Sequence, residues 1–301
     1  MRTNDNNRKG REASLVDGAE PSGALINEGL VIHRIYQQGK YLSLKVDSYF
    51  QVYEELFRDF VGKPVVFVEV GVLNGGSLFM WREYFGPQAR IIGVDLNPAA
   101  KRWESEGFEI HIGSQSDPNF WKTFFTQIGD IDVLLDDGGH TNAQQIVTTA
   151  MALPHVRNGG LVVVEDTHAS YMSEFGNPSK YSFDSFAKRI VDSVNSRYSG
   201  IKTDFSGHQW LVYNVQFFQS IVAFRIDRRR CFISKPVRNE GVNSSAQDFR
   251  YRGTSRENVH YAKLRLAEAF PKFAPMIRLL FILPERILAG IENRRMRQYF
   301  E

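Results

Sequence analysis

The sequence feature that most constrains the fold is an apolar run that ends abruptly in polar residues. Val133, Leu134 and Leu135 precede the stretch Asp136-Asp137-Gly138-Gly139-His140. A short apolar run is typical of a buried strand, and in an open α/β sheet ligands bind just beyond the carboxyl ends of the strands. A second run, at residues 161–164, ends in the same way at Glu165-Asp166-Thr167-His168. If the two strands are neighbours, their acids converge, and we expect a metal ion there with a base beside it.

The segment from residue 65 to residue 166 alternates between strand and helix patterns. Apolar or β-branched runs predict strands at residues 65–70, 90–95, 108–112, 132–136 and 161–164, and the turn before the last of them is placed at residues 158–160. Helical patterns lie at residues 47–61, 78–85, 141–153 and 183–198. Residues 215–224 read as a terminal hairpin. This order predicts an α/β fold, in which a mostly parallel sheet carries helices on both faces.

The first predicted strand is followed by the glycine-rich turn Gly71-Val72-Leu73-Asn74-Gly75-Gly76-Ser77. Such a turn lets a ligand approach the backbone at a helix N-terminus. Asp95 ends the next strand about 20 residues after this turn, where a carboxylate accepts hydrogen bonds from the hydroxyls of a ribose. The alternative for Asp95 is a cap or turn residue. Gln115 and Ser116, after the third strand, either border an adenine or belong to a helix cap.

The composition excludes several classes of protein. The 301 residues are 43% hydrophobic and 24% charged, which is ordinary for a soluble globular protein. The net charge is only +3 and no long basic run is present, so a nucleic-acid partner is not expected. The sequence has a single cysteine, Cys231, which excludes an intrachain disulfide and fits a reducing compartment, so we expect a cytoplasmic location.

The two ends of the chain differ in character from its middle. Residues 1–24 are polar and lack the apolar core of a signal peptide, so we expect a disordered tail before a domain at residues 25–235. Residues 236–301 are expected to form a polar linker and a helical extension. An apolar stretch from Phe273 is too short to span a membrane. It reads as a helix that packs on the protein or joins copies of a homo-oligomer, with a peripheral membrane-surface helix as the alternative.

The motifs and their order resemble the class I S-adenosylmethionine-dependent methyltransferases. The resemblance rests on Val68-Glu69-Val70-Gly71, Asp95, Gly113-Ser114-Gln115-Ser116-Asp117, Asp136-Asp137-Gly138-Gly139-His140 and Glu165-Asp166-Thr167-His168. More narrowly, residues 41–226 are similar to the metal-dependent macrolide-sugar O-methyltransferases of the mycinamicin type and to the cephalosporin hydroxylase and rhamnosyl O-methyltransferase group. The resemblance implies a Rossmann-like, seven-stranded, mostly parallel sheet with a terminal antiparallel hairpin.

The same resemblance implies roles for individual residues. Glu69, Gly71 and Ser77 would line the methionine end of S-adenosylmethionine, with Gly75 in the same turn. Asp95 would hold the ribose, Gln115 and Ser116 would lie near the adenine, and Asp136 would shape the cofactor pocket. Asp137, Glu165 and Asp166 would bind Mg²⁺, and His140 would be the general base.

This assignment agrees with the chemistry of sugar O-methylation. A sugar hydroxyl is a poor nucleophile, and a hard cation held by carboxylates stabilises the developing alkoxide while an imidazole takes the proton. The acceptor is expected to be a small molecule or glycan, with residues 170–178 as a substrate lid whose Tyr171 and Phe175 suit a sugar ring. His140 as a structural donor, and Glu165 and Asp166 as helix caps, remain open. So do an NAD-dependent oxidoreductase, a hydroxylase-like relative and a non-catalytic binding protein.

Overall fold

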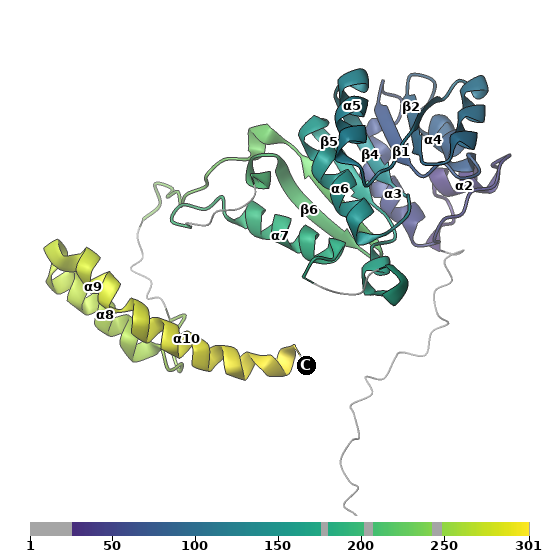
Figure 1. Ribbon diagram of the computed structural model, residues 1–301. Helices are drawn as coiled ribbons and strands as arrows, with labels where there is room; N and C mark the ends of the chain where they lie inside the picture. The colour runs from purple at the N-terminus through teal and green to yellow at the C-terminus, as the bar shows by residue number, and fades with distance from the viewer. Residues whose placement is uncertain (1–25, 176–179, 202–206, 243–248, 301) are drawn as a thin grey trace, which may run out of the picture. The chain divides into compact units, whose positions relative to one another are not determined.

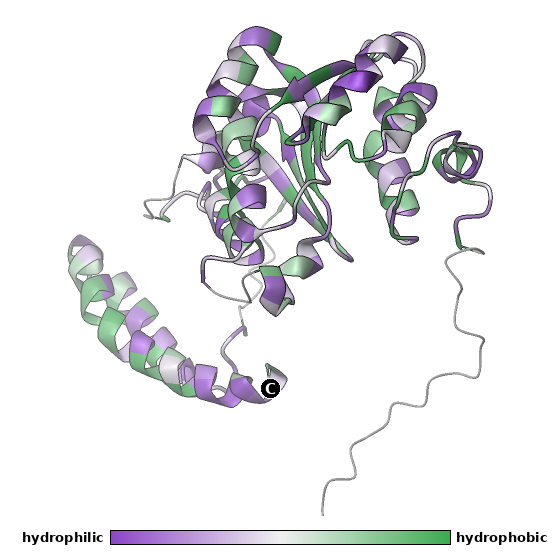
Figure 2. Ribbon diagram, turned by 45° about the vertical axis from the view of Figure 1, so that its right-hand side comes forward, coloured by the Kyte–Doolittle hydropathy of each residue, from purple (hydrophilic) through white to green (hydrophobic). Residues whose placement is uncertain are grey.

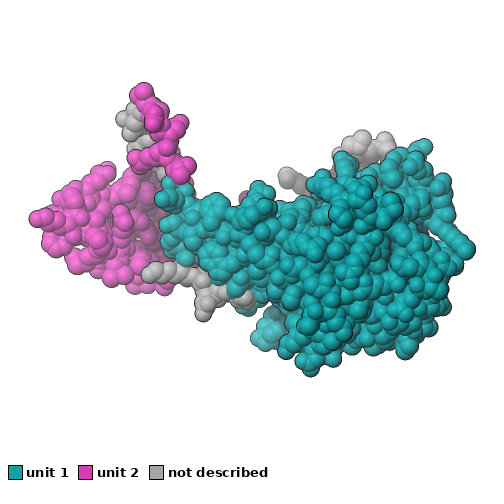
Figure 3. Space-filling model, turned by 90° about the horizontal axis from the view of Figure 1, so that it is seen from above, with its two compact units in different colours: residues 1–236 teal, residues 237–301 magenta. Residues whose placement is uncertain are grey.

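The computed structural model describes residues 26–175, 180–201, 207–242 and 249–300. The chain divides into two compact units, residues 1–236 (unit 1) and residues 237–301 (unit 2), which Figure 3 colours teal and magenta. The predicted disordered tail, residues 1–24, lies outside the described residues, as do parts of the predicted lid and linker.

Unit 1 is built on a seven-stranded sheet with the order β3-β2-β1-β4-β5-β7-β6 (Figure 1). The first five strands in this order are parallel, and β7 and β6 add an antiparallel hairpin at one edge. The strands are β1 Val66–Val70, β2 Arg90–Asp95, β3 Glu109–Ile112, β4 Ile131–Asp136, β5 Val156–Val164, β6 Val212–Phe218 and β7 Ile221–Ile226. The predicted sheet, including its terminal hairpin, is therefore confirmed.

Helices cover both faces of this sheet (Figure 1). On one face lie α2 Val31–Gln37, α3 Tyr49–Phe57 and α4 Gly76–Phe85, and on the other lie α5 Pro118–Ile128, α6 Asn142–Ala152 and α7 Phe183–Asn195. Short 3₁₀ turns connect them: η1 Arg58–Phe60, η2 Pro98–Glu106, η3 Leu153–His155, η4 Thr167–Tyr171, η5 Ser173–Phe175, η6 His208–Trp210 and η7 Arg228–Arg230.

The alternation of side chains along the strands creates two cores. Phe67 on β1 and Leu135 on β4 enter the core under α3 and α4, whereas their neighbours Val68 and Leu134 enter the core under α5 and α6. All four side chains are fully buried. A parallel strand that is buried on both faces needs a continuous apolar run, which explains why the sequence pattern of β1 and β4 shows no polar alternation.

The differences from the predicted elements have local causes. Residues 158–160, expected as a turn, lie within β5 at an irregularity, where the pairing with β4 passes from Ile131↔Val156 to Val133↔Leu161. Gly160 suits this place because a Cβ there would lie 2.3 Å from the carbonyl oxygen of Asp132. The helix predicted at residues 47–61 ends as an α-helix at Phe57 and tightens into η1. Helix α2 was not predicted, since its seven residues are too few for a clear periodic pattern.

Unit 2 consists of helices joined by short turns. They are α8 Glu257–Ala269, η8 Pro271–Phe273, α9 Ala274–Leu280, α10 Ile282–Met296 and η9 Arg297–Tyr299. Within the described parts of the chain, no helix is both long enough and apolar enough to cross a lipid bilayer.

The register of the sheet in unit 1 places three strand ends side by side. Val70 on β1 is paired with Asp136 on β4, and Asp136 is paired in turn with Val164 on β5. The carboxyl ends of β1, β4 and β5 therefore meet at one edge of the sheet, together with the polar residues that come directly after them.

Candidate functional site

A cavity of about 730 Å³ lies at the carboxyl ends of β1, β2, β4 and β5. Its volume is within the usual range for a small-molecule site, about 300–1,000 Å³. Of the predicted site residues, eight line this cavity: Gly71, Ser77, Asp95, Gln115, Asp137, His140, Glu165 and Asp166. Four do not line it: Glu69, Gly75, Ser116 and Asp136. The wall also includes residues 42–46, which precede α3 and were not predicted to take part.

The turn after β1 brings backbone to the cavity at close range. Gly71 has φ +92°, and a Cβ there would lie 2.0 Å from the carbonyl oxygen of Asp137. Gly76 starts α4, and a Cβ there would lie 2.4 Å from the carbonyl oxygens of Tyr41 and Leu42. Glycine is needed at both positions because the turn, the end of β4 and the segment at residues 42–46 are packed backbone against backbone.

Asp95 at the end of β2 faces the cavity with a fixed carboxylate. Its Oδ2 accepts hydrogen bonds from the backbone N–H groups of Val72 (2.8 Å) and Leu73 (3.1 Å), and its Oδ1 accepts one from Asn97 (2.8 Å). Asp95 therefore both holds the turn after β1 and faces the cavity. Carboxylate oxygens hold two lone pairs each, so the same group retains acceptor capacity toward a ligand.

Gln115 organises the loop after β4 from inside the protein. Its Nε2 donates to Asp136 Oδ1 (2.9 Å), and its Oε1 accepts from the backbone N–H of Gly139 (2.8 Å). Asp136 is buried, and burial raises its pKa to about 6. Ser116 is exposed, and Asp117 caps α5 by accepting from the backbone N–H of Asn119. The cap of α5 is therefore Asp117 rather than Gln115 or Ser116, and Gln115 lies at the cavity.

Glu69 lies beneath the cavity rather than on its wall. Ser77 Oγ donates to Glu69 Oε2 (2.8 Å), and Trp81 Nε1 donates to Glu69 Oε1 (2.9 Å). The side chain is completely buried, and burial raises its pKa to about 7, against the effect of the nearby Lys45 ammonium. Glu69 thus anchors the start of α4 to β1 from below.

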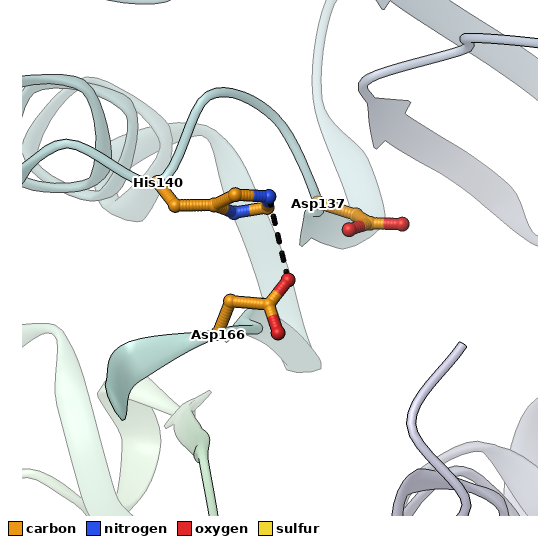
Figure 4. A group of neighbouring side chains, drawn as sticks. All are labelled: Asp137, His140 and Asp166. Atoms are coloured by element: carbon orange, nitrogen blue, oxygen red, sulfur yellow. Dashed lines mark ion pairs between the residues drawn. The ribbon is translucent and has the colours of Figure 1, made fainter. Parts of the chain in front are cut away.

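Three predicted residues form a compact cluster on the opposite side of the cavity. Asp137, His140 and Asp166 each present one potential ligand atom, and these atoms lie within 4.8 Å of one another. Figure 4 shows His140 and Asp166 facing each other, with His140 Nε2 3.4 Å from Asp166 Oδ2 and Asp137 beside them. Two carboxylates and an imidazole are a donor set that fits a divalent cation.

The backbone at this cluster is locally strained. His140 has φ +58° and Asp166 has φ +53°, both in the left-handed region that non-glycine residues seldom adopt. Asp166 is held there by Tyr49 on α3, whose hydroxyl donates to Asp166 Oδ1 (2.6 Å) and accepts from the Asp166 backbone N–H (3.1 Å). Strain of this kind concentrates at functional sites, where the surrounding structure enforces it.

Glu165 is separated from this cluster, although it was predicted as a third metal ligand. Its carboxylate is buried and accepts hydrogen bonds from Tyr53 (2.5 Å to Oε1) and from Lys45 (3.1 Å to Oε2). Burial raises the pKa of Glu165 above its ordinary value, and the Lys45 ammonium opposes that shift. The structure thus groups Asp137 and Asp166 with His140, while Glu165 contacts a lysine and a tyrosine.

Lys45 is the site residue that sequence reasoning missed. Its side chain is 1% exposed, and Nζ lies 2.5 Å from Asp137 Oδ2, 3.1 Å from Glu165 Oε2 and 3.8 Å from Glu69 Oε1. Burial disfavours its charge, but the carboxylates of Asp137, Glu165 and Glu69 outweigh burial and raise the pKa of Lys45 above its ordinary value. A single lysine before a predicted helix carries no sequence signal, since its two hydrogen-bond partners, Asp137 and Glu165, are 92 and 120 residues away.

The predicted lid is described only up to Phe175. The Phe175 ring lies 6.4 Å from the His140 ring in an edge-on arrangement. Tyr171 is 60% exposed. His168 Nδ1 lies 3.9 Å from Asp166 Oδ1, at the rim of the same cluster. Aromatic side chains therefore border the cluster at Phe175, and the stacking role of Tyr171 stays a prediction.

Comparison with known proteins agrees with this arrangement. Residues 68–167 match a family described as a methyltransferase domain. The chain is 33% identical over 162 residues to 8-demethyl-8-alpha-L-rhamnosyl tetracenomycin-C 2'-O-methyltransferase of Streptomyces olivaceus, covering 50% of this chain and 42% of that protein. It is 34% identical over 158 residues to mycinamicin VI 2''-O-methyltransferase of Micromonospora griseorubida, covering 47% and 38% respectively.

The fold has a similar counterpart among solved structures. The methyltransferase MycE from the mycinamycin biosynthetic pathway, solved in complex with Mg and SAH, aligns with a TM-score of 0.56 and 25% identity over 66% of this chain and 52% of that chain. The chain spans half or less of the length of the curated relatives it matches. These findings confirm the predicted resemblance: residues 68–167 match a methyltransferase domain, and the chain resembles the S-adenosylmethionine-dependent O-methyltransferases of the mycinamicin type.

Proposed function

We propose that the protein is an S-adenosylmethionine- and Mg²⁺-dependent O-methyltransferase that acts on a hydroxyl of a sugar or glycosylated metabolite. The observation that carries this proposal is that one cavity joins the glycine turn and Asp95 on one side to Asp137, His140 and Asp166 on the other. The relatives support the acceptor class, since their names describe O-methylation of rhamnosyl, olivosyl and mycinamicin compounds.

Different residues of the chain would bind the metal, the cofactor and the acceptor in this reaction. When bound, S-adenosylmethionine would supply the sulfonium methyl group and Mg²⁺ would supply Lewis acidity toward the acceptor hydroxyl. Asp137 and Asp166 would hold the metal, with Glu165 as the further carboxylate predicted from the sequence. Asp95 would fix the ribose, and the backbone of Gly71, which lines the cavity, would lie beside the methionine end. Methyl transfer is an in-line displacement, so this positioning would supply much of the rate.

His140 is proposed as the general base. An imidazole titrates near neutrality and is suited to accept the hydroxyl proton. Its Nδ1 is buried and has no hydrogen-bond partner among the described residues, so Nε2, which faces Asp166, is the atom proposed to receive the proton. The same nitrogen is within reach of the candidate metal position, so His140 acts either as a base or as a ligand, and these two roles predict different results.

The test is calorimetric titration of the full chain with S-adenosylhomocysteine and with Mg²⁺, followed by an acceptor screen with glycosides that carry vicinal hydroxyls. We expect Asp95→Asn to lose the cofactor product and Asp137→Asn to lose Mg²⁺. His140→Gln should keep both affinities and lose methyl transfer, whereas His168→Gln, altered at the rim of the same cluster, should retain activity.

Three outcomes would contradict the proposal. The absence of S-adenosylhomocysteine binding to the wild type, with binding of NAD instead, would favour an oxidoreductase. A product that gains oxygen rather than a methyl group would favour a hydroxylase-like reaction. Loss of Mg²⁺ affinity in His140→Gln would make His140 a metal ligand and would refute its role as the base.

A further inference from the structure

Unit 2 leaves most of its large apolar side chains in solvent. Within residues 237–242 and 249–300, Ile277 is the one large apolar side chain that is buried. Helices α8, α9 and α10 contact one another, but so small a group of helices encloses too little volume for a core of its own. Figure 2 shows green, hydrophobic stretches along these helices. A surface of this kind is typically covered by a partner or a membrane.

The exposed apolar side chains concentrate around one bend. Residues 269–284 contain nine large apolar residues, two basic residues and no acidic residue. Seven of the nine are exposed by between 42% and 67%: Phe270, Phe273, Met276, Leu279, Leu280, Ile282 and Leu283. We call these seven side chains the apolar bend. Within α9, Met276, Leu279 and Leu280 follow i, i+3, i+4 spacing and form one exposed apolar stripe, with Arg278 on the opposite side of the helix.

The charge of unit 2 has the opposite sign to that of unit 1. Residues 237–301 contain twelve lysines and arginines against seven aspartates and glutamates, a formal charge of +5, whereas residues 1–236 carry −2. Two ion pairs join α8 to α10, Arg256 with Glu292 and Lys263 with Glu285. Around the apolar bend, Lys272, Arg278 and Arg286 have no carboxylate partner among the described residues.

These features discriminate between the surfaces that would cover unit 2. A second copy of the chain would bring two units of charge +5 together, which is unfavourable. An anionic phospholipid surface would cover the apolar side chains and neutralise the cations at the same time. We propose that unit 2 binds the surface of an anionic membrane, with the apolar bend inserted among the acyl chains and Lys272, Arg278 and Arg286 at the headgroups. This proposal is independent of the reaction catalysed by unit 1.

The proposal is tested by co-sedimentation of the full chain with vesicles of phosphatidylcholine, alone or with about a third of phosphatidylglycerol. We expect binding to the anionic vesicles and at least tenfold weaker binding to the neutral ones or in high salt. Arg278→Gln/Arg286→Gln should weaken binding by about thirtyfold at low salt. Leu279→Ser/Leu283→Ser should weaken it by about tenfold or more, without changing its salt dependence.

Matched variants of unit 1 serve as controls. Phe232→Ser/Ile233→Ser removes two apolar side chains that are 64% and 52% exposed, and Arg34→Gln/Arg189→Gln removes two exposed arginines. Both should bind vesicles like the wild type. The proposal is overturned if the wild type does not sediment with anionic vesicles, or if the unit 2 variants bind as well as their controls. It is also overturned if sedimentation velocity shows a dimer that Leu279→Ser/Leu283→Ser dissociates, while vesicle binding is unchanged.

Discussion

Replacement of Lys45 by methionine tests how the acidic cluster is held together. The Lys45 side chain is 1% exposed, and its Nζ lies within 3.8 Å of three carboxylates. Methionine keeps most of the length and apolar volume of lysine but removes the charge, so Asp137 and Glu165 lose the cation that compensates them. Removal of one partner from a buried ion network typically costs about 3–5 kcal/mol, because the remaining charges stay buried. We therefore expect the free energy of unfolding to fall by about 3 kcal/mol or more in metal-free buffer.

The assay is urea unfolding followed by circular dichroism, with EDTA present, at pH 7.5. Lys188→Met is the matched control, because Lys188 makes an i,i+4 pair with Asp184 at 2.6 Å while its side chain is 65% exposed. An exposed pair of this type contributes only about 0.3–0.5 kcal/mol. The comparison therefore isolates the effect of burial from the effect of losing a lysine.

Magnesium adds a second readout to the same variant. Lys45 contacts Asp137, a candidate ligand, so its removal makes the cluster more negative and should strengthen Mg²⁺ binding. Mg²⁺ at about 100 times its dissociation constant would then restore about 2.7 kcal/mol. A loss of stability below about 1 kcal/mol would refute the account of a buried ion network. Weaker Mg²⁺ binding in Lys45→Met would refute the idea that the ammonium and the metal compete for Asp137.

Other contacts in unit 1 give three further predictions. Gly71→Ala should destabilise the protein by more than about 2 kcal/mol, because the φ of Gly71 is +92° and a Cβ would meet a carbonyl oxygen at 2.0 Å. The control Gly62→Ala, with φ +72° and open space around the new Cβ, should cost about 1 kcal/mol in the same urea assay. Tyr49→Phe removes the hydroxyl that orients Asp166, so it should weaken Mg²⁺ binding by about 10–100-fold in calorimetry. An unchanged affinity for Mg²⁺ would exclude Asp166 as a ligand. Burial lowers the pKa of His155, so the unfolded chain binds the proton at higher pH than the folded protein. The contribution of neutral His155 to stability is then present above about pH 6.5 and is lost as the pH falls. His155→Gln should flatten this decline, measured as thermal melts between about pH 7.5 and 5.5.

The sheet could be predicted because each of its strands has a distinct pattern in the sequence. The runs that became β4 and the second half of β5 are apolar, and their polar ends at Asp136 and Glu165 mark the edge where the cavity lies. The same logic placed Asp137, His140 and Asp166 near one another, and the structure brings them within 4.8 Å.

The remaining features depend on contacts that no local pattern records. Gly160 is needed inside β5 because a carbonyl oxygen of the adjacent strand approaches it, and this approach is visible only after the strands are paired. Lys45, Tyr49 and Tyr53 belong to the N-terminal part of unit 1, where the sequence showed only an amphipathic helix. From the sequence alone, each of them is indistinguishable from an ordinary surface or core residue, because its acidic partner follows β4 or β5 far along the chain.

The position of these three side chains in the sequence has a consequence for how the site is formed. Lys45, Tyr49 and Tyr53 reach their acidic partners across 92 to 120 residues of chain, and all three precede the segment 68–167 that matches a methyltransferase domain. Contacts between such distant residues form late, since loop closure comes before any gain from the contact. The acids after β4 and β5 are therefore neutralised and oriented only when α3 and the segment before it are docked on the sheet. A transplanted segment 68–167 would carry the acids without the groups that hold them in place.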